Sequence, residues 1–271
     1  MNRGLLAKAL RESWRGTLVL GVGLAVAEVA LAYALLKFQD ELSVLWSQIT
    51  FLQRAFRAIF GADVAGRPGP EMLSAIAWVH PAVFALVWAH AITYCTRIPA
   101  GEVDRGTIDV LLGMPVSRWQ LYRTETIAWL ASGAVILLLG AAGNMFGHLV
   151  AAGGARPDPR RLAIVIANLF CLYLAVGGLA WLVSAPSDRR GRAMGVVFAF
   201  VLASFLLNYL AQFWSPAERV SFLSLLHYYR PLPILHDGTW PVRDMIILLL
   251  SGGGLWTVGG FIFARRDLST L

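Results

Sequence analysis

The chain has 271 residues, a formal net charge of +7, 58% hydrophobic residues and only 14% charged residues. An average soluble domain carries about 25% charged residues, so this chain has too few charges to cover a globule of its size. The same composition excludes a disordered chain, which needs low hydrophobicity and high charge, and the presence of only two cysteines excludes a disulfide-rich scaffold. We therefore expect an integral membrane protein.

Six continuous apolar stretches are each long enough to cross the bilayer core as an α-helix, which takes about 20 residues. Their apolar residues do not alternate with polar ones as in a barrel strand, so the pattern favours an all-α fold. The predicted spans cover residues 17–36, 73–95, 125–150, 162–184, 193–213 and 242–263. We expect them to form a single transmembrane domain over residues 1–271. The first stretch is too long for a signal-peptide core and is interpreted as a retained span.

The distribution of arginine and lysine predicts the orientation of the chain. If the N-terminus is inside, the inner segments are residues 1–16, 96–124, 185–192 and 264–271, and they hold slightly more than half of the 23 basic residues. The positive-inside rule then places both termini in the cytoplasm. The net charge is interpreted as attachment to the inner leaflet, and no nucleic-acid partner is expected.

Three stretches outside the spans show the apolar spacing of amphipathic helices. Residues 3–15 predict a helix on the inner membrane surface that leads into the first span, and residues 42–60 predict an interfacial helix on the outer surface. In residues 215–229, Ser215 and Glu218 form a capping box at the start of a third amphipathic helix. For the two outer stretches, packing against the spans is an equal alternative.

Glycine and proline mark two further features of the predicted spans. His80 followed by Pro81 predicts a kink in the second span. Gly143 and Gly147 form a G-x-x-x-G pattern in the third span, which allows close approach of another helix. Packing within the subunit is favoured over homodimerisation at this pattern.

The segment between the second and third spans predicts a short helix between two breaks. Gly106 can break a helix, Thr107 can cap a new one, and Pro115 ends it. Asp109 falls in the first turn, where the helix dipole favours a carboxylate, and Ser117 can cap the helix that enters the third span.

This short helix would carry exposed leucines, Leu111 and Leu112, outside the membrane. A loop that only connects two spans needs no exposed apolar side chains. An apolar surface with charged neighbours is typical of a docking site, so the segment predicts contact with another protein.

The run from Glu102 to Arg118 consists of acidic residues, then Arg-Gly-Thr, Leu-Leu and Pro-Val-Ser-Arg. It resembles the cytoplasmic coupling-helix segment of ABC-2 type permeases, the membrane subunits of a class of ATP-driven exporters. Residues 227–231 more weakly resemble a stretch ahead of the last span in short permeases of this type. The resemblance implies that the following residues contact an ATPase: Glu102, Asp104, Arg105, Gly106, Thr107, Asp109, Leu111, Leu112, Pro115, Val116, Ser117 and Arg118.

The resemblance further implies a permease subunit in a bacterial-type cytoplasmic membrane, paired with a second copy or a related permease and surrounded by lipid. Each permease would bind a separate ATPase. The chain lacks the pattern G-x-x-x-x-G-K-[ST], and its only lysines are Lys8 and Lys37, so ATP and Mg²⁺ would bind to the partner. No cofactor is expected on this chain, and it is not expected to be an enzyme.

A membrane-embedded hydrolase or transferase with an outer-facing His/Asn site is the alternative. The sequence contains neither H-E-x-x-H nor G-x-S-x-G. His80 and His90 are ten residues apart, about 80° from a shared helix face, which is poor spacing for metal ligands. His227 and His236 both lie on the predicted outer side, where interfacial roles are more usual than metal binding.

Five polar residues inside the spans are candidates for a substrate path. Glu28 lies near the middle of the first span, where a carboxylate is costly unless it is paired, protonated or facing a cavity. Asn144 and His148 lie one turn apart in the third span, and Asn168 and Asn208 lie in the outer halves of the fourth and fifth spans. Hydrogen bonding between helices is the alternative to a substrate path.

Overall fold

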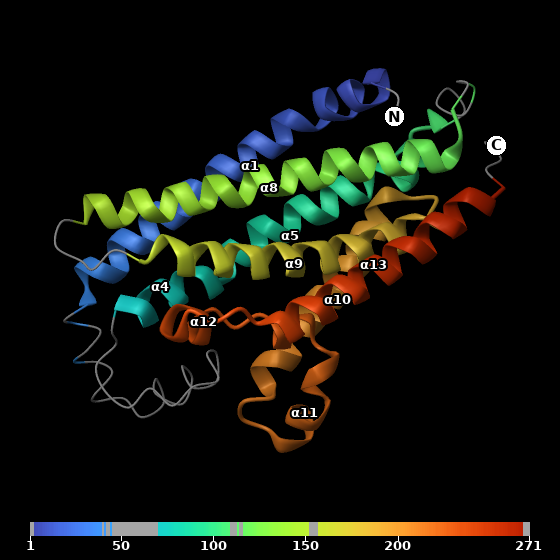
Figure 1. Ribbon diagram of the computed structural model, residues 1–271. Helices are drawn as coiled ribbons and strands as arrows, with labels where there is room; N and C mark the ends of the chain where they lie inside the picture. The colour runs from blue at the N-terminus through green and yellow to red at the C-terminus, as the bar shows by residue number, and fades with distance from the viewer. Residues whose placement is uncertain are drawn as a thin grey trace.

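The computed structural model describes residues 3–39, 41, 44, 70–108, 113, 116–151 and 157–267. Within these residues the chain is helical and contains no strand (Figure 1). The long helices are α1 (Arg3–Lys37), α4 (Pro70–Val79), α5 (Pro81–Cys95), α8 (Arg118–Val150), α9 (Pro159–Ser184), α10 (Arg190–Leu210) and α13 (Val242–Arg265). Shorter elements are η1 (Arg97–Gly101), α6 (Glu102–Asp104), α11 (Ser215–Val220), η2 (Ser221–Leu223), η3 (Leu225–Tyr228) and α12 (Pro231–Asp237).

Among the described residues, five helices are long and apolar enough to cross a membrane, and a sixth span results if α4 and α5 count as one. The break between α4 and α5 bends the chain by 42°, which confirms the kink predicted at His80. His80 is the N-cap of α5, and its Nδ1 accepts a hydrogen bond from the backbone N–H of Ala82 at 3.2 Å. The structure is therefore consistent with the predicted all-α membrane protein.

Two of the predicted amphipathic helices differ in the structure. Residues 3–15 are not a separate surface helix but the first turns of α1, because no proline interrupts the helix and it continues through Gly16. Residues 215–229 form three short helices instead of one, and Trp214, without a side-chain hydrogen bond, is the N-cap in place of Ser215. The predicted helix over residues 42–60 lies outside the described residues.

The two ends of the bundle are distinguished by the chain termini, which both lie at the same end (Figure 1). We call this the terminal end; α5 ends there, and α8 begins there. At the opposite end, called the distal end, α8 ends and α9 begins, whereas α13 begins nearer the middle of the bundle and runs to the terminal end (Figure 1). The described residues on both sides of the connection from α6 to α8 consequently lie at the terminal end.

Close backbone contacts join the long helices into two pairs. In the α1–α8 pair, a Cβ added at Gly143 would lie 2.3 Å from the carbonyl oxygen of Ala25. In the α9–α13 pair, a Cβ at Gly178 would lie 2.2 Å from the carbonyl oxygen of Gly252. Gly147 also packs on α1, so the G-x-x-x-G pattern serves packing within the subunit. Such contacts require glycine because any side chain would separate the helices.

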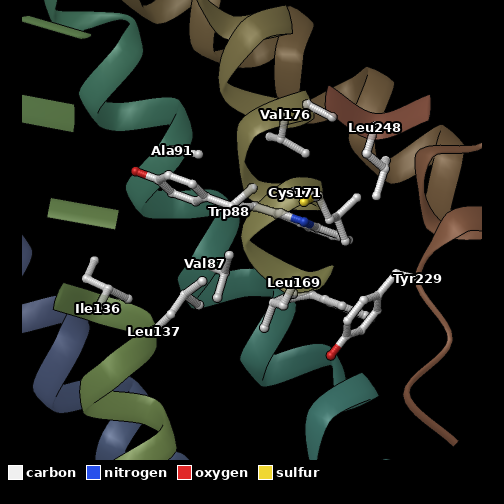
Figure 2. Close-up of a cluster of buried hydrophobic side chains, with 14 of the residues drawn as sticks. Val87, Trp88, Ala91, Ile136, Leu137, Leu169, Cys171, Val176, Tyr229 and Leu248 are labelled. Carbon is white, nitrogen blue, oxygen red and sulfur yellow. The ribbon is translucent and has the colours of Figure 1, made fainter. Parts of the chain in front are cut away.

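The apolar core lies between these pairs and is filled mainly by α5 and α9. Figure 2 shows Trp88 of α5 beside Cys171 of α9, with Tyr229 reaching the same region from the segment before α12. The Tyr229 hydroxyl donates a hydrogen bond to the carbonyl oxygen of Trp78 at 3.3 Å. Cys95 and Cys171 are both buried and free.

Candidate functional site

The chain leaves α5 at the terminal end through η1 and α6 and then turns at Gly106. Gly106 has φ +67°, a left-handed conformation that residues with a side chain rarely adopt, which confirms the predicted helix break. The buried carboxylate of Glu102 accepts hydrogen bonds from the guanidinium of Arg105 at 2.6 Å and from the hydroxyl of Thr107. Glu102 therefore closes the turn around Gly106.

Asp104 connects this turn to α10. Its Oδ2 accepts a hydrogen bond from the backbone N–H of Arg190, the first residue of α10, at 3.3 Å. The guanidinium of Arg190 donates to the carbonyl oxygen of Thr93 in α5 at 2.8 Å. The start of α10 is thus held against the segment that follows α5.

The centre of the predicted coupling segment lies outside the described residues. This applies to Asp109, Leu111, Leu112 and Pro115, so the coupling helix stays a prediction. The described flanks are Ile108, which is fully buried, and Val116, which is half-buried.

At the other flank, α8 begins where the sequence predicts. Ser117 is its N-cap, and the hydroxyl oxygen accepts a hydrogen bond from the backbone N–H of Gln120 at 3.1 Å. Arg118 donates hydrogen bonds to the carbonyl oxygens of Phe263, at 3.4 Å, and Arg266. The start of α8 therefore caps the C-terminal end of α13.

Arg266 extends this contact to the loop between α9 and α10. Its guanidinium donates to the carbonyl oxygens of Ala185 at 3.0 Å and Ser187 at 3.1 Å, and it pairs with Asp188. Both flanks of the coupling segment are thus fixed to the bundle, one near α10 and the other at α13.

A buried ion-pair cluster, the Arg97 cluster of Arg97, Glu12 and Glu125, lies where α5 passes into η1. Arg97 is 9% exposed and Glu125 is 3% exposed. The guanidinium pairs with Glu125 of α8 and, at 2.6 Å, with Glu12 of α1, and it stands 5.2 Å from the ring centre of Tyr94. Burial lowers the pKa of the Arg97 guanidinium, but the neighbouring carboxylates outweigh this effect and hold it above its usual value.

Sequence reasoning missed the Arg97 cluster. Arg97 counted only as one of several basic residues of the predicted inner segment, and Glu125 appeared as the first residue of the third span. An acidic residue beside an apolar run of this length was the available signal.

The structure brings three of the five candidate substrate-path residues together. Glu28 is 0% exposed, and its Oε2 accepts a hydrogen bond from the Asn144 amide at 2.8 Å. The backbone carbonyl of Asn144 is 2.9 Å from Nδ1 of His148, whose Nε2 is 3.3 Å from the hydroxyl of Ser74. This polar chain links α1, α8 and α4.

The other two candidates lie elsewhere among the described residues. The Asn168 amide donates to the carbonyl oxygen of Tyr228 at 3.3 Å, and Asn208 is half-buried on α10. A groove of about 400 Å³ between α8 and α9 is lined by apolar residues such as Leu138 and Ile166 and by none of the five candidates.

The histidines at the distal end have separate neighbours. Nε2 of His227 accepts a hydrogen bond from Arg230 at 3.1 Å, and burial together with Arg230 lowers the pKa of His227. Asp237 lies 2.8 Å from His236 and raises the pKa of that histidine. Within the described parts of the chain, no group of three or more His, Cys, Asp or Glu residues is placed to hold a metal ion.

Comparison with known proteins identifies the family. A comparison with curated proteins finds no matching relative. The family model for the ABC-2 family transporter proteins matches residues 5–268. Because this match spans nearly the whole chain and agrees with the set of apolar helices, this multi-pass membrane protein belongs to the ABC-2 transporter family.

Proposed function

We propose that the chain is the permease subunit of an ATP-binding cassette transporter and that a separate ATPase supplies the energy. Family membership and the membrane-spanning helices support this function. ATP and Mg²⁺ bind to the ATPase, because the sequence carries no phosphate-binding loop. The protein lies in a bacterial-type cytoplasmic membrane with its terminal end in the cytoplasm.

The observation that carries this proposal is the position of the two described flanks of residues 106–118. Both flanks lie at the terminal end, where Asp104 holds one to α10 and Arg118 holds the other to α13. A force applied to the segment therefore reaches two membrane-spanning helices directly. This is the arrangement that an ATPase-docking element requires.

Replacing Leu111 and Leu112 with alanine tests the docking site. The double change removes about six methyl-type groups, worth ~0.8 kcal/mol each, so docking would weaken by at most about 4–5 kcal/mol before ordering costs are subtracted. Each ~1.4 kcal/mol is tenfold in affinity, so half of this loss is visible in a pull-down of the ATPase. Wild-type binding and transport by the double variant would remove the main support for the proposal.

Gly106→Val is the matched variant that leaves the docking surface unchanged. Valine would be strained at φ +67°, although no atom of the described residues is found within 4 Å of its Cβ position. We expect this variant to bind the ATPase through the unaltered leucines but to lose ATP-driven transport, because the segment is misplaced.

The polar chain of Glu28, Asn144 and His148 is proposed to contribute to the substrate path together with Asn168 and Asn208. Its position at the contact between α1, α8 and α4 means that substrate reaches it only when these helices separate. The cost of a carboxylate at this depth supports a role beyond packing.

We also propose that two permease subunits associate through α10. The buried residues of α10 are Ala193, Val197, Val201 and Ser204. The opposite, exposed face presents Gly191, Gly195, Ala199 and Ala203 at intervals of four residues. Among the described residues, no atom outside α10 lies within 4 Å of a Cβ placed at either glycine. Small residues at this spacing allow two helices to approach closely in a membrane.

A further inference from the structure

The Arg97 cluster connects the start of the coupling segment to two helices at once. Arg97 is the first residue of η1, which leads through α6 to Gly106. Its single guanidinium pairs with one carboxylate from α1 and one from α8. These two helices are held together along their length by the glycine contacts of the α1–α8 pair. A displacement of η1 therefore moves α1 and α8 together, as one rigid body.

The pairing is strong enough to transmit movement because most of the cluster is buried. Separating Arg97 from Glu125 would leave the buried Glu125 carboxylate without its cation, which is far more costly than opening an exposed ion pair. Glu12 is more exposed and is held additionally by Lys8 at 2.8 Å. Moving Glu125 together with η1 thus costs less than breaking the pair.

The contacts of η1 with the α9–α13 pair are weaker. The backbone N–H of Ala100 donates to the hydroxyl of Ser184 in α9 at 3.3 Å, a long hydrogen bond between neutral groups. Hydrogen bonds between charged groups are roughly twice as strong as neutral ones. Movement of η1 is consequently delivered to the α1–α8 pair in preference to the α9–α13 pair.

The boundary between the two pairs permits relative movement at the distal end. The apolar groove between α8 and α9 separates them there, and Pro159 at the start of α9 lines it. At the terminal end, Arg118 of α8 holds the C-terminal end of α13. The two pairs are therefore joined directly at the terminal end, whereas at the distal end α4 lies between them, with Ser74 in contact with His148 of α8 and Glu71 in an exposed ion pair with Arg161 of α9.

We infer that Arg97 is the positioning residue through which the coupling segment moves the α1–α8 pair relative to the α9–α13 pair. This inference rests on the proposed function, since the movement originates in an ATPase bound to the coupling segment. Arg97 contacts neither ATP nor substrate in this role. Its loss should uncouple the helices from the ATPase without preventing assembly.

The test measures the distance between spin labels at Leu149→Cys in α8 and Val242→Cys in α13. Both positions are exposed, Leu149 near the end of α8 and Val242 at the first residue of α13, and the native cysteines are buried. The permease–ATPase complex is compared without nucleotide and after trapping with ATP and vanadate. We expect a clear shift of the distance distribution in the otherwise unaltered complex.

In Arg97→Gln, the shift should fall to less than half while the same amount of ATPase co-purifies and still hydrolyses ATP. Arg97→Lys retains the charge and should retain most of the shift. Arg161→Gln is the matched control, because its ion pair with Glu71 does not involve η1, so this variant should not reduce the shift. A full shift in Arg97→Gln, even with a lowered unfolding temperature, would show that the cluster only stabilises the fold and would overturn the inference.

If Arg97→Gln does not insert, Glu125→Gln decides the question. Glutamine keeps the size of the side chain and an oxygen that can accept from Arg97, while it removes the buried ion pair with α8. We expect a reduced shift, and a full shift would refute the inference. If the unaltered complex binds no ATPase or shows no shift, the proposed function itself is wrong. If the unaltered complex shows the shift and the variants show it in full, only the inference about Arg97 is wrong.

Discussion

Glu28 is a fully buried carboxylate whose hydrogen-bond donor is a neutral amide, that of Asn144. A carboxylate at this depth in a membrane span is costly, and an amide compensates for it less than a cation would. The contact joins α1 to α8 near the residues Ala25 and Gly143, where the helices are closest. Glu28 therefore has a hydrogen-bond partner on the neighbouring helix, and burying its carboxylate still costs free energy that this partner does not fully offset.

Glu28→Ala should lower the stability of the subunit by about 1–3 kcal/mol, because the buried Asn144 amide loses its acceptor. Glu28→Gln keeps an acceptor oxygen and should lower it less. Thermal unfolding in detergent measures both effects. Asn208→Ala, at a half-buried position on α10, is the control and should leave the unfolding temperature nearly unchanged.

The ionisable role of Glu28 is tested separately by Glu28→Gln in the complex with its ATPase. If Glu28 serves the substrate path as an acid, this variant should lose substrate-stimulated ATP hydrolysis while it unfolds near the wild-type temperature. Normal transport and normal stimulation by the purified variant complex would assign Glu28 to helix packing alone.

Residue-level features that depend on near neighbours were predictable from the sequence. The N-cap at Ser117 and the break at Gly106 each follow from a few adjacent residues. The pairing of Arg97 with Glu125 was not predictable, because it joins residues 28 positions apart on different elements whose relative rotation only tertiary packing fixes. The partner of Glu28 was missed for the same reason.

At the scale of elements, the contact between α1 and α8 depends on glycine at one central position. Gly143→Ala would place a Cβ 2.3 Å from the carbonyl oxygen of Ala25, and backbone on both sides leaves it nowhere to move. Overpacking of this kind costs about 1–3 kcal/mol. We expect a lowered unfolding temperature for Gly143→Ala and no loss for Gly195→Ala, whose Cβ would meet no atom within 4 Å. Equal stability of the two variants would contradict this account of the helix pair.

The elements outside the spans were harder to predict than the spans themselves. Continuous hydrophobicity identified the apolar helices, and Pro81 identified the break at His80. The helix predicted over residues 215–229 is divided because Ser224 adopts an extended conformation and donates a hydrogen bond to the carbonyl oxygen of Ser204 in α10 at 2.8 Å. A tertiary hydrogen bond of this kind overrides the amphipathic pattern, and the local sequence does not reveal it.

At the scale of the whole molecule, the proposed orientation places the terminal end in the cytoplasm. Two single-cysteine variants show on which side of the membrane each end lies. One replaces Arg189, an exposed residue before α10, and the other replaces Trp240, an exposed residue before α13. A membrane-impermeant thiol reagent added to intact cells should label Trp240→Cys and leave Arg189→Cys unlabelled until the membrane is opened. The native cysteines are buried and should contribute little background. Labelling in the reverse order would invert the topology.

The association of two subunits through α10 is the last prediction. Small residues at intervals of four allow two α10 helices to cross with their backbones close together. A cysteine at Ala199 would then face the same cysteine of the second copy. A disulfide forms between cysteines whose Cα atoms are about 4.4–6.8 Å apart, and this crossing brings the two positions into that range. Mild oxidation in native membranes should convert Ala199→Cys to a covalent dimer. Leu138→Cys, exposed on α8, is the matched control and should stay monomeric. Replacing Gly195 with leucine should abolish the cross-link at position 199, because a large side chain on this face holds the backbones apart. The subunit itself should still fold, because no atom of the other described elements lies within 4 Å of a Cβ at position 195. A cross-link that persists in the leucine variant, or forms equally well at Leu138, would exclude α10 as the specific contact between the two copies.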